Sequence, residues 1–200
     1  MKKEEKQTLV LASGNAGKIR EFAEMFPAFN VRGYKDFGLD FEIEETGKTF
    51  YENALIKAKT VSEALNLPAL ADDSGLCVES LHGAPGIFSA RYAGDGNDEH
   101  NIQKLLYDLR GEKNRRAKFV CSLVVCYPDG RIIAAEGETH GEILLEKDGE
   151  NGFGYDPIFY SDDLKKSFGK ATDTEKNSVS HRARAISALK EKTGVRTGNR

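Results

Sequence analysis

The chain has no apolar stretch as long as the roughly 18 residues that a membrane-spanning helix requires. Its first residues, Met1–Gln7, are charged and lack the apolar core of a secretory signal. We therefore expect a cytoplasmic protein that does not bind a membrane.

A surplus of basic residues is absent as well. Lys and Arg together number 29, Asp and Glu number 32, and the formal net charge is −3. Proteins that coat nucleic acid carry a basic patch or stripe, so we expect no nucleic-acid partner. Local basic groups could still bind a small anion.

Cysteine is scarce. The three cysteines, Cys77, Cys121 and Cys126, have no CxxC spacing and lie in apolar stretches typical of strands. This pattern predicts reduced core residues. Cys121 and Cys126 would face opposite sides of a regular strand, so they could not share a metal ion.

No internal repeat and no linker divides the sequence. A length of 200 residues with 39% apolar residues suits one globular unit. We expect a single domain over residues 1–200, with a charged N-terminal extension at Met1–Gln7 and a frayed polar tail at Thr193–Arg200.

Apolar periodicity predicts alternating strands and helices. Strands are expected at Thr8–Ala12, Asn30–Tyr34, Phe119–Tyr127, Arg131–Thr139, Glu142–Leu145 and Ile158–Tyr160. Helices are expected from Ile19 to Phe26, from Thr49 to Leu65 with capping-box spacing to Glu52, over Asp98–Leu109, and over one final helix opened by Glu175–Arg182. The strands from Ala117 to Leu145 should form an antiparallel meander.

Two adjacent carboxylates stand at Ala71–Gly75, between the apolar runs Leu67–Leu70 and Leu76–Val78. We expect one strand to stop and the next to start here, which is where α/β proteins hold ligands. A polar turn without function is the alternative, because Asp, Ser and Gly are common turn residues.

A glycine loop, Ser13–Lys18, follows the first predicted strand and precedes a predicted helix. This layout can cradle phosphate, because backbone N–H groups, the helix start and Lys18 all favour an anion. It is not a Walker A loop, since Ile19 follows Lys18 where Ser or Thr should stand. A plain turn with a solvated lysine is the alternative.

Three further stretches carry polar or aromatic groups outside the predicted elements. Phe41–Gly47 is interpreted as an extended segment ending in Glu44 and Glu45, and His82–Gly94 as an ordered loop. Gly152–Pro157 is a second glycine-rich loop whose aromatic residues could stack on a base or fill the core.

Lys176, His181 and Arg182 lie at the predicted start of the final helix. Cations are disfavoured at a helix N-terminus unless an anion is present. This local conflict suggests an anion site, although a solvated helix start would have the same sequence.

Taken together, these motifs resemble the inosine/xanthosine triphosphate pyrophosphatase family, the dITP/XTP pyrophosphatases. The motifs run in order along nearly the whole chain: Ser13-Gly14-Asn15 with Lys18, Glu44–Gly47 with Thr49-Phe50 and Glu52–Ala54, Ala71–Leu76, Gly83–Gly86, Ser89–Tyr92, Gly152–Pro157 and Ser180–Arg182. Ser13 stands where many members have Thr, which keeps the hydroxyl.

The resemblance implies an α/β fold with an elongated mixed sheet, helices on both sides, and two lobes with a central cleft. It also implies a Mg²⁺-dependent homodimer that converts deaminated purine nucleoside triphosphates to monophosphate and pyrophosphate. Such an enzyme cleanses the nucleotide pool.

The resemblance implies a role for each matched residue. Ser13, Gly14, Asn15, Ala16, Gly17 and Lys18 would bind the triphosphate, and Glu44 and Asp73 would hold Mg²⁺. Asp73 would be the general base, Ser74 would contact substrate, and the nucleotide pocket would comprise Phe153, Gly154, Tyr155, Asp156, Lys176, His181 and Arg182. Glu45 and Asp72 stay open as alternative or outer ligands.

Two other functions fit parts of the pattern. Maf-like nucleotide pyrophosphatases share the reaction but prefer other bases, and they lack this combination of Phe-Gly-Tyr-Asp and Ser-His-Arg. A catalytically silent nucleotide-binding module would need no acidic pair, which repels a triphosphate unless a metal lies between.

Overall fold

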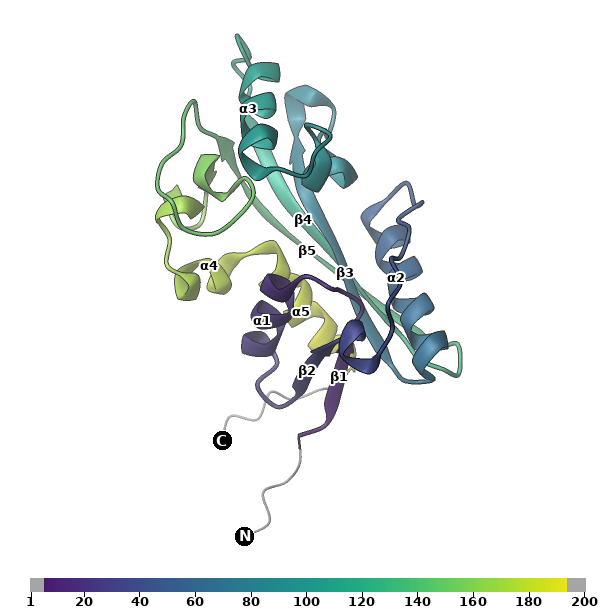
Figure 1. Ribbon diagram of the computed structural model, residues 1–200. Helices are drawn as coiled ribbons and strands as arrows, with labels where there is room; N and C mark the ends of the chain where they lie inside the picture. The colour runs from purple at the N-terminus through teal and green to yellow at the C-terminus, as the bar shows by residue number, and fades with distance from the viewer. Residues whose placement is uncertain (1–5, 194–200) are drawn as a thin grey trace. The chain divides into compact units, whose positions relative to one another are not determined.

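The computed structural model describes residues 6–193 (Figure 1). Most of the predicted N-terminal extension, Met1–Gln7, and of the predicted tail, Thr193–Arg200, lies outside the described residues. The chain divides into two compact units. Among the described residues, unit 1 comprises residues 6–73, Ser122–Ala135 and residues 186–193, and unit 2 comprises Ser74–Cys121 and Glu136–Ala185.

The strands form a seven-stranded sheet in the order β2-β1-β3-β4-β5-β6-β7. They are β1 (Thr8–Leu11), β2 (Asn30–Gly33), β3 (Ala69–Val78), β4 (Arg116–Cys126), β5 (Ile132–Ile143), β6 (Phe159–Ser161) and β7 (Lys166–Ser167). The β1–β2 and β1–β3 pairs are parallel, whereas β5–β6 and β6–β7 are antiparallel. The prediction of an α/β fold with a mixed sheet is confirmed.

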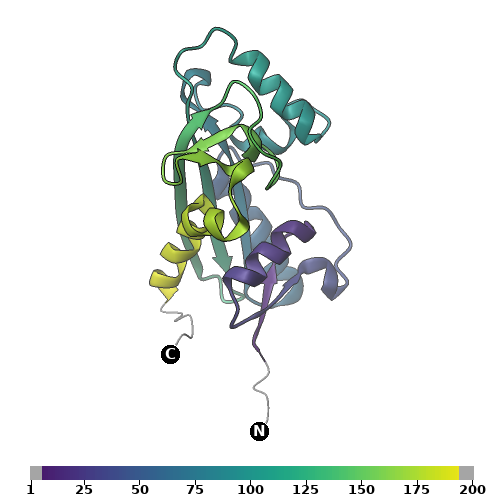
Figure 2. The same ribbon diagram turned by 90° about the vertical axis from the view of Figure 1, so that its left-hand side faces the viewer.

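The helices are α1 (Ala16–Met25), α2 (Phe50–Leu65), α3 (Asp98–Asp108), α4 (Asp173–Val179) and α5 (His181–Thr193). Figures 1 and 2 both show α1 beside β1 and β2. Within the described part of the chain, no helix is long and apolar enough to cross a membrane.

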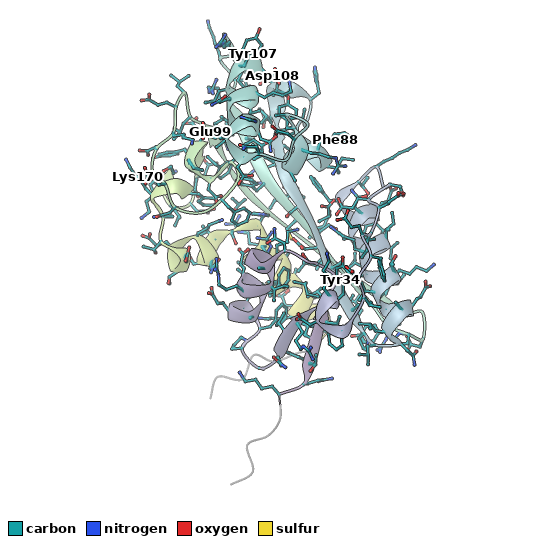
Figure 3. The ribbon with its side chains drawn as sticks, viewed as in Figure 1. Tyr34, Phe88, Glu99, Tyr107, Asp108 and Lys170 are labelled. Atoms are coloured by element: carbon teal, nitrogen blue, oxygen red, sulfur yellow. The ribbon has the colours of Figure 1, made fainter. Side chains whose placement is uncertain are left out.

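Unit 1 is organised by its parallel strands. Leu11 of β1 pairs with Gly33 of β2 and with Leu70 of β3. Because parallel strands end at the same edge of a sheet, the segments after β1, β2 and Leu70 all begin at that edge. The core packed around them includes Val10, Tyr34, Ala54, Ala58, Val61, Ala69, Ala71 and Val124, and Tyr34 is labelled in Figure 3.

The strand β3 corrects one prediction. Asp72 and Asp73 lie inside a continuous strand rather than between two strands, and residues 69–73 are all buried. Turn propensity of Asp, Ser and Gly is overridden here because both flanks are apolar and both carboxylates find partners in the folded chain. The strand therefore places the two side chains on opposite faces.

Two further predictions were wrong in detail. The stretch His82–Gly94 contains a 3₁₀ helix, Gly86–Arg91, where we expected no regular element. The strand β5 continues through Gly141 to Ile143, where we expected a break. The turn between β4 and β5 is present, with Tyr127 N–H bonded to Arg131 O, and consecutive neighbours joined so tightly run antiparallel.

The predicted final helix is two helices. Ser180 has an extended backbone, its N–H closes α4 on Lys176 O, and its hydroxyl accepts from Ala183 N–H to cap α5. Lys176 therefore lies in the last turn of α4, where a cation is favourable, and not at a helix start. The predicted conflict remains only for His181 and Arg182, the first residues of α5.

Unit 2 has an aromatic core. Phe119, Phe159 and Phe168 pack together, with centroid separations of 4.7 Å for Phe119–Phe159 and 5.1 Å for Phe159–Phe168. Gly137 of β5 lies against the first turn of α5, so that an added Cβ would overlap Ala185 N and His181 O and lie 2.8 Å from Arg184 C. The approach of β5 to α5 therefore requires glycine.

We predict that Gly137→Ala lowers the free energy of unfolding by about 3 kcal/mol, because backbone atoms would have to move. Denaturant unfolding measures this loss. Glu136→Ala, at an exposed neighbouring position of β5, is the control and should change stability by less than about 0.5 kcal/mol. A Gly137→Ala variant as stable as the control would contradict the close packing.

Candidate active site

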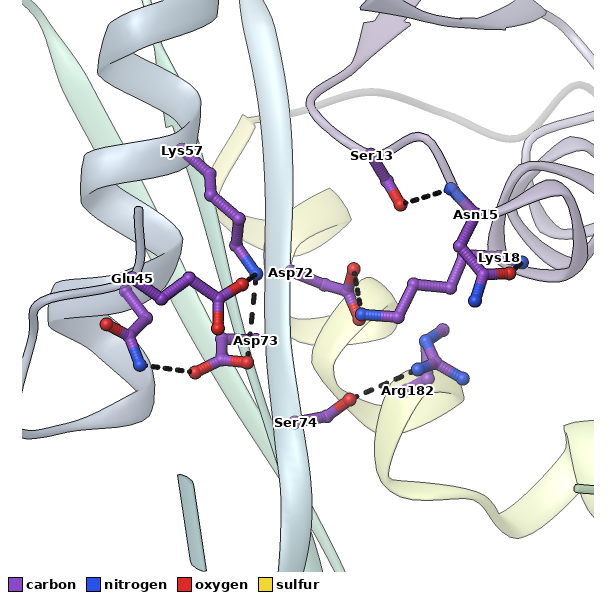
Figure 4. A network of polar contacts seen from close by, with 10 residues as sticks. Ser13, Asn15, Lys18, Glu45, Lys57, Asp72, Asp73, Ser74 and Arg182 are labelled. Carbon is purple, nitrogen blue, oxygen red and sulfur yellow. Dashed lines mark hydrogen bonds and ion pairs between the residues drawn. The ribbon is translucent and has the colours of Figure 1, made fainter. Parts of the chain in front are cut away.

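The loop after β1 is held by its own side chains. Ser13 Oγ accepts from Asn15 N–H at 3.1 Å, and Asn15 Oδ1 accepts from Lys18 N–H at 3.0 Å (Figure 4). Asn15 is thereby the N-cap of α1. The predicted strand-loop-helix layout is confirmed, and it leaves the loop exposed at the edge where β1 ends.

On one face of β3, Asp72 pairs with that loop. Lys18 Nζ donates to Asp72 Oδ1 at 3.1 Å, and the Asp72 side chain has no exposed surface. Lys18 belongs to the first turn of α1, so this ion pair ties the glycine loop to the acidic strand. The Asp72 charge is therefore neutralised inside unit 1.

On the other face, Asp73 meets α2. Asn53 Nδ2 donates to Asp73 Oδ2 at 3.0 Å, and Lys57 Nζ lies 3.7 Å from Asp73 Oδ1. Lys57 Nζ also donates to Glu45 Oε1 at 2.7 Å. Figure 4 shows Asp72 and Asp73 on opposite sides of the strand, each facing a lysine.

Asn53 links Asp73 to the acidic segment. Its Oδ1 accepts from Gly47 N–H at 2.8 Å while its Nδ2 donates to Asp73. A Cβ at Gly47 would lie 2.6 Å from Asn53 Oδ1, so glycine permits this approach. The segment 41–47 has no regular secondary structure, and this amide fixes its end beside Asp73.

Burial sets the proton affinities of this cluster. Burial raises the pKa of Asp73 above its ordinary value, and Glu45 adds to the rise, whereas Lys57, Asn53 and Lys18 oppose it. Burial alone would lower the pKa of Lys57, but the surrounding carboxylates outweigh it and raise that pKa. The result is a protonated lysine next to a carboxylate that is a stronger base than a solvated one.

Asn53 and Lys57 are functional candidates that our sequence-based assignment missed. Both are buried although they are polar. They are four residues apart on the same flank of the apolar stripe formed by Phe50, Ala54 and Ala58. Polar side chains on the buried face of an amphipathic helix are the signal that could have identified them.

The acidic segment supplies one carboxylate to the cluster, and it is Glu45. Glu44 is exposed, and across residues 6–193 no hydrogen bond or ion pair of its side chain is found, whereas Glu45 pairs with Lys57. The same range contains no group of three or more His, Cys, Asp and Glu side chains arranged to hold a metal ion.

The donor set nevertheless suits Mg²⁺. This ion takes one or two carboxylates and completes its shell with waters and substrate phosphates. On the Asp73 face of the strand, Asp73 and Glu45 carry two negative charges beside the one positive charge of Lys57. A cation is therefore electrostatically favoured beside Asp73.

In unit 2, Asp156 organises the second glycine-rich loop. Its carboxylate is buried and accepts from Phe153 N–H at 2.9 Å and from Lys176 Nζ at 2.6 Å. The Lys176 ammonium lies 4.5 Å from the centroid of the Phe153 ring, in cation–π contact. The loop and the lysine of α4 are thus held by one carboxylate.

The two aromatic residues of this loop differ in exposure. The Phe153 side chain is 55% exposed, whereas Tyr155 is 4% exposed and packs in the unit 2 core. The Tyr155 hydroxyl donates to Ser89 O at 2.9 Å. Only Phe153 therefore offers a ring face to a ligand.

The start of α5 carries the remaining predicted residues of unit 2. Arg182 is buried and its Nη2 donates to Ser74 Oγ at 3.2 Å. The His181 ring stacks on Phe119, with centroids 5.0 Å apart. The structure thus brings Ser74 and Arg182 together, and their role in one site stays a prediction.

We predict that Gly152→Ala disturbs this loop more than Gly154→Ala. Both glycines have positive φ, but a Cβ at Gly152 would overlap Asp156 Oδ2 and lie 2.8 Å from its Cγ, whereas Gly154 has open space. Strain alone costs about 1–2 kcal/mol at either position, and the overlap adds roughly 1–3 kcal/mol at Gly152. Equal losses of unfolding free energy would contradict the role of Asp156.

Comparisons with known proteins agree on one family. A sequence model of the Ham1 family matches residues 9–192. A dITP/XTP pyrophosphatase of Bacillus cereus is 46% identical over 196 residues, which covers 94% of this chain and 96% of the relative.

Solved structures agree as well. The Ham1 protein of Staphylococcus aureus has a TM-score of 0.87 at 46% identity, covering 94% of this chain and 98% of that one. A HAM1 protein from Coxiella burnetii has a TM-score of 0.86 at 39% identity, covering 94% and 98%.

Proposed function

The chain belongs to the Ham1 family, and we propose that it hydrolyses dITP/ITP and XTP/dXTP to the nucleoside monophosphate and pyrophosphate. The protein would thereby remove deaminated purine nucleotides from the nucleotide pool. The observation that carries the proposal is Asp73, a buried carboxylate of raised pKa held between Asn53 and Lys57.

The triphosphate is bound by the loop after β1 in this proposal. Ser13, Gly14, Asn15, Ala16, Gly17 and Lys18 supply backbone N–H groups, a hydroxyl and one ammonium. A helix start and closely approaching amides favour phosphate oxygens. Support comes from the position of the loop at the carboxyl end of parallel β1, where open sheets hold ligands.

Mg²⁺ is the proposed cofactor, held by Asp73 together with Glu44 or Glu45. When bound, the ion would offset phosphate charge and lower the pKa of a coordinated water. Of the two glutamates, Glu45 already lies in the Asp73 cluster. Asp72 is occupied by Lys18 and is better suited to orient that lysine than to bind a metal.

Asp73 is the proposed general base. It takes a proton from the water that attacks the α-phosphorus, and the P–O bond to pyrophosphate breaks in line. A raised pKa makes the carboxylate a better proton acceptor, and the protonated Lys57 beside it keeps Asp73 ionised when substrate arrives.

Base selection is assigned to the residues of unit 2. Phe153 would stack on the purine, and Gly154, Tyr155 and Asp156 would shape the loop that presents it. Hypoxanthine and xanthine have a C6 carbonyl and an N1 donor, the reverse of adenine, so matched backbone groups would reject adenine by leaving polar atoms unpaired. Lys176, His181, Arg182 and Ser74 would bind the rest of the nucleotide.

The oligomeric state and the cellular location are proposed from the family resemblance and from the cysteines. We propose a homodimer, as the family resemblance implies. We propose a cytoplasmic location, supported by Cys77 and Cys126, which are free thiols in the structure.

The function is tested by incubating the protein with dITP, XTP, GTP and dATP, with and without Mg²⁺, and separating the products. We expect monophosphate and pyrophosphate from dITP and XTP only, and only with Mg²⁺. Diphosphate with orthophosphate, or no turnover, would refute the proposal. Turnover confined to other bases would favour the Maf-like alternative, and Mg²⁺-independent nucleotide binding without turnover would favour the silent module.

In the same assay, Asp73→Asn is the matched variant, since it keeps the shape of the side chain and its contact with Asn53. We expect its kcat to fall by at least about 100-fold at saturating Mg²⁺. Near wild-type turnover would remove Asp73 from the base role.

Phe153→Ala should raise the KM for dITP about tenfold, because stacking of an aromatic ring on a base contributes roughly 1–3 kcal/mol. Its kcat should change little, since the ring does not touch the reacting phosphorus. Leu145→Ala, at an exposed apolar position of unit 2, is the control. An unchanged KM would exclude stacking by Phe153.

A further inference from the structure

Lys35 lies against the glycine loop although it comes from a different part of unit 1. It belongs to the short 3₁₀ turn Tyr34–Phe37 that follows β2. A Cβ added at Gly14 would lie 3.1 Å from Lys35 Cε and 3.7 Å from Lys35 Nζ. The side chain of Lys35 therefore crosses the loop at Gly14, with its ammonium at the loop surface.

The backbone that carries Lys35 is fixed. Tyr34 is buried and its hydroxyl donates to Phe41 O at 2.8 Å, while Asp36 Oδ2 accepts from Gly33 N–H at 3.1 Å. A Cβ at Gly33 would lie 2.9 Å from Ser13 O. Because the two parallel strands end side by side, the turn after β2 packs directly on the loop after β1.

The ammonium of Lys35 has no charged partner within hydrogen-bond or ion-pair distance among residues 6–193. Its neighbour Asp36 faces Gly33 N–H and lies 4.0 Å from Arg32 Nε. Lys18, the other lysine at the loop, is paired with Asp72. In the range 6–193, Lys35 is exposed and no ion pair, hydrogen bond or cation–π contact of its ammonium is found.

We propose that Lys35 is a second phosphate-binding lysine, which contacts the pyrophosphate portion of the substrate triphosphate. The sheet order β2-β1-β3 places Lys35 on the β2 side of the loop, whereas Asp72 and Asp73 are on the β3 side. If Asp73 acts at the α-phosphorus, the lysine on the far side of Gly14 faces the leaving β- and γ-phosphates. The inference thus rests on the proposed function and extends it.

The test measures calorimetric affinity for inorganic tripolyphosphate with Mg²⁺, and the KM and kcat for dITP. For Lys35→Gln we expect a three- to tenfold rise in the tripolyphosphate dissociation constant and in KM, roughly the effect of one charge-assisted hydrogen bond. The kcat should stay within about twofold, because Lys35 does not reach the attacked phosphorus. Lys35→Arg should keep the wild-type affinity.

Lys59→Gln is the control, because Lys59 is 64% exposed on α2 of the same unit. Equal affinities of Lys35→Gln and Lys59→Gln for tripolyphosphate would overturn the inference while leaving the proposed function intact. If wild-type protein binds tripolyphosphate through Lys35 but does not turn over dITP or XTP, the proposed function fails and the phosphate contact stands. Absence of tripolyphosphate binding in the wild type would overturn the inference.

Discussion

Two neighbouring carboxylates on one buried strand impose the main constraint on unit 1. Asp72 and Asp73 face opposite sides of β3, and each pairs with a different lysine, Lys18 for Asp72 and Lys57 for Asp73. An unpaired buried charge costs several kcal/mol, which is a large share of the stability of a typical domain. The fold supplies an ammonium on each face of the strand, Lys18 and Lys57, and the charge of Lys57 acts on both carboxylates.

This constraint links the local elements to the site. Lys18 reaches Asp72 because Asn15 caps α1 directly after the glycine loop, and Lys57 reaches Asp73 because α2 packs its apolar stripe on the sheet. The same residues that neutralise the acids thus fix the loop and the acidic segment. The ion pairs Lys18–Asp72 and Lys57–Asp73 therefore stabilise the fold and also position the residues of the candidate site.

Most regular elements of the described chain could be predicted from periodicity and caps. Thr49 and Asn97 begin α2 and α3 as helix N-caps, and the glycine loop lies where the sequence placed it. Phe153 and the carboxylate of Asp73 could be named from motifs, but their environments could not. The raised pKa of Asp73 depends on its burial and on Glu45, which is distant in sequence and meets Asp73 only in the folded chain.

The errors have a common physical cause. The sequence predicts a break within β3 because Asp, Ser and Gly favour turns locally. In the folded chain, partners on both faces of the strand make the extended form stable. The sequence predicts one helix in place of α4 and α5. The cap at Ser180 depends on one hydroxyl and one backbone angle, which apolar periodicity does not reveal. Phe153 and Tyr155 are both aromatic residues of the same loop, so the sequence does not distinguish them. Packing in the folded chain buries Tyr155 in the core and leaves the Phe153 ring exposed.

Slow hydrolysis of the Asn53 side-chain amide would limit how long the site stays intact. This amide has a distinct donor end on Asp73 and a distinct acceptor end on Gly47, so the side chain cannot be turned around. Loss of its amide nitrogen by slow hydrolysis would set a new carboxylate against Asp73 and Glu45, and asparagine is among the thermolabile residues. The helical backbone of α2 holds Asn53 away from the cyclic geometry that this reaction needs. The helix therefore preserves the site against ageing as well as positioning it.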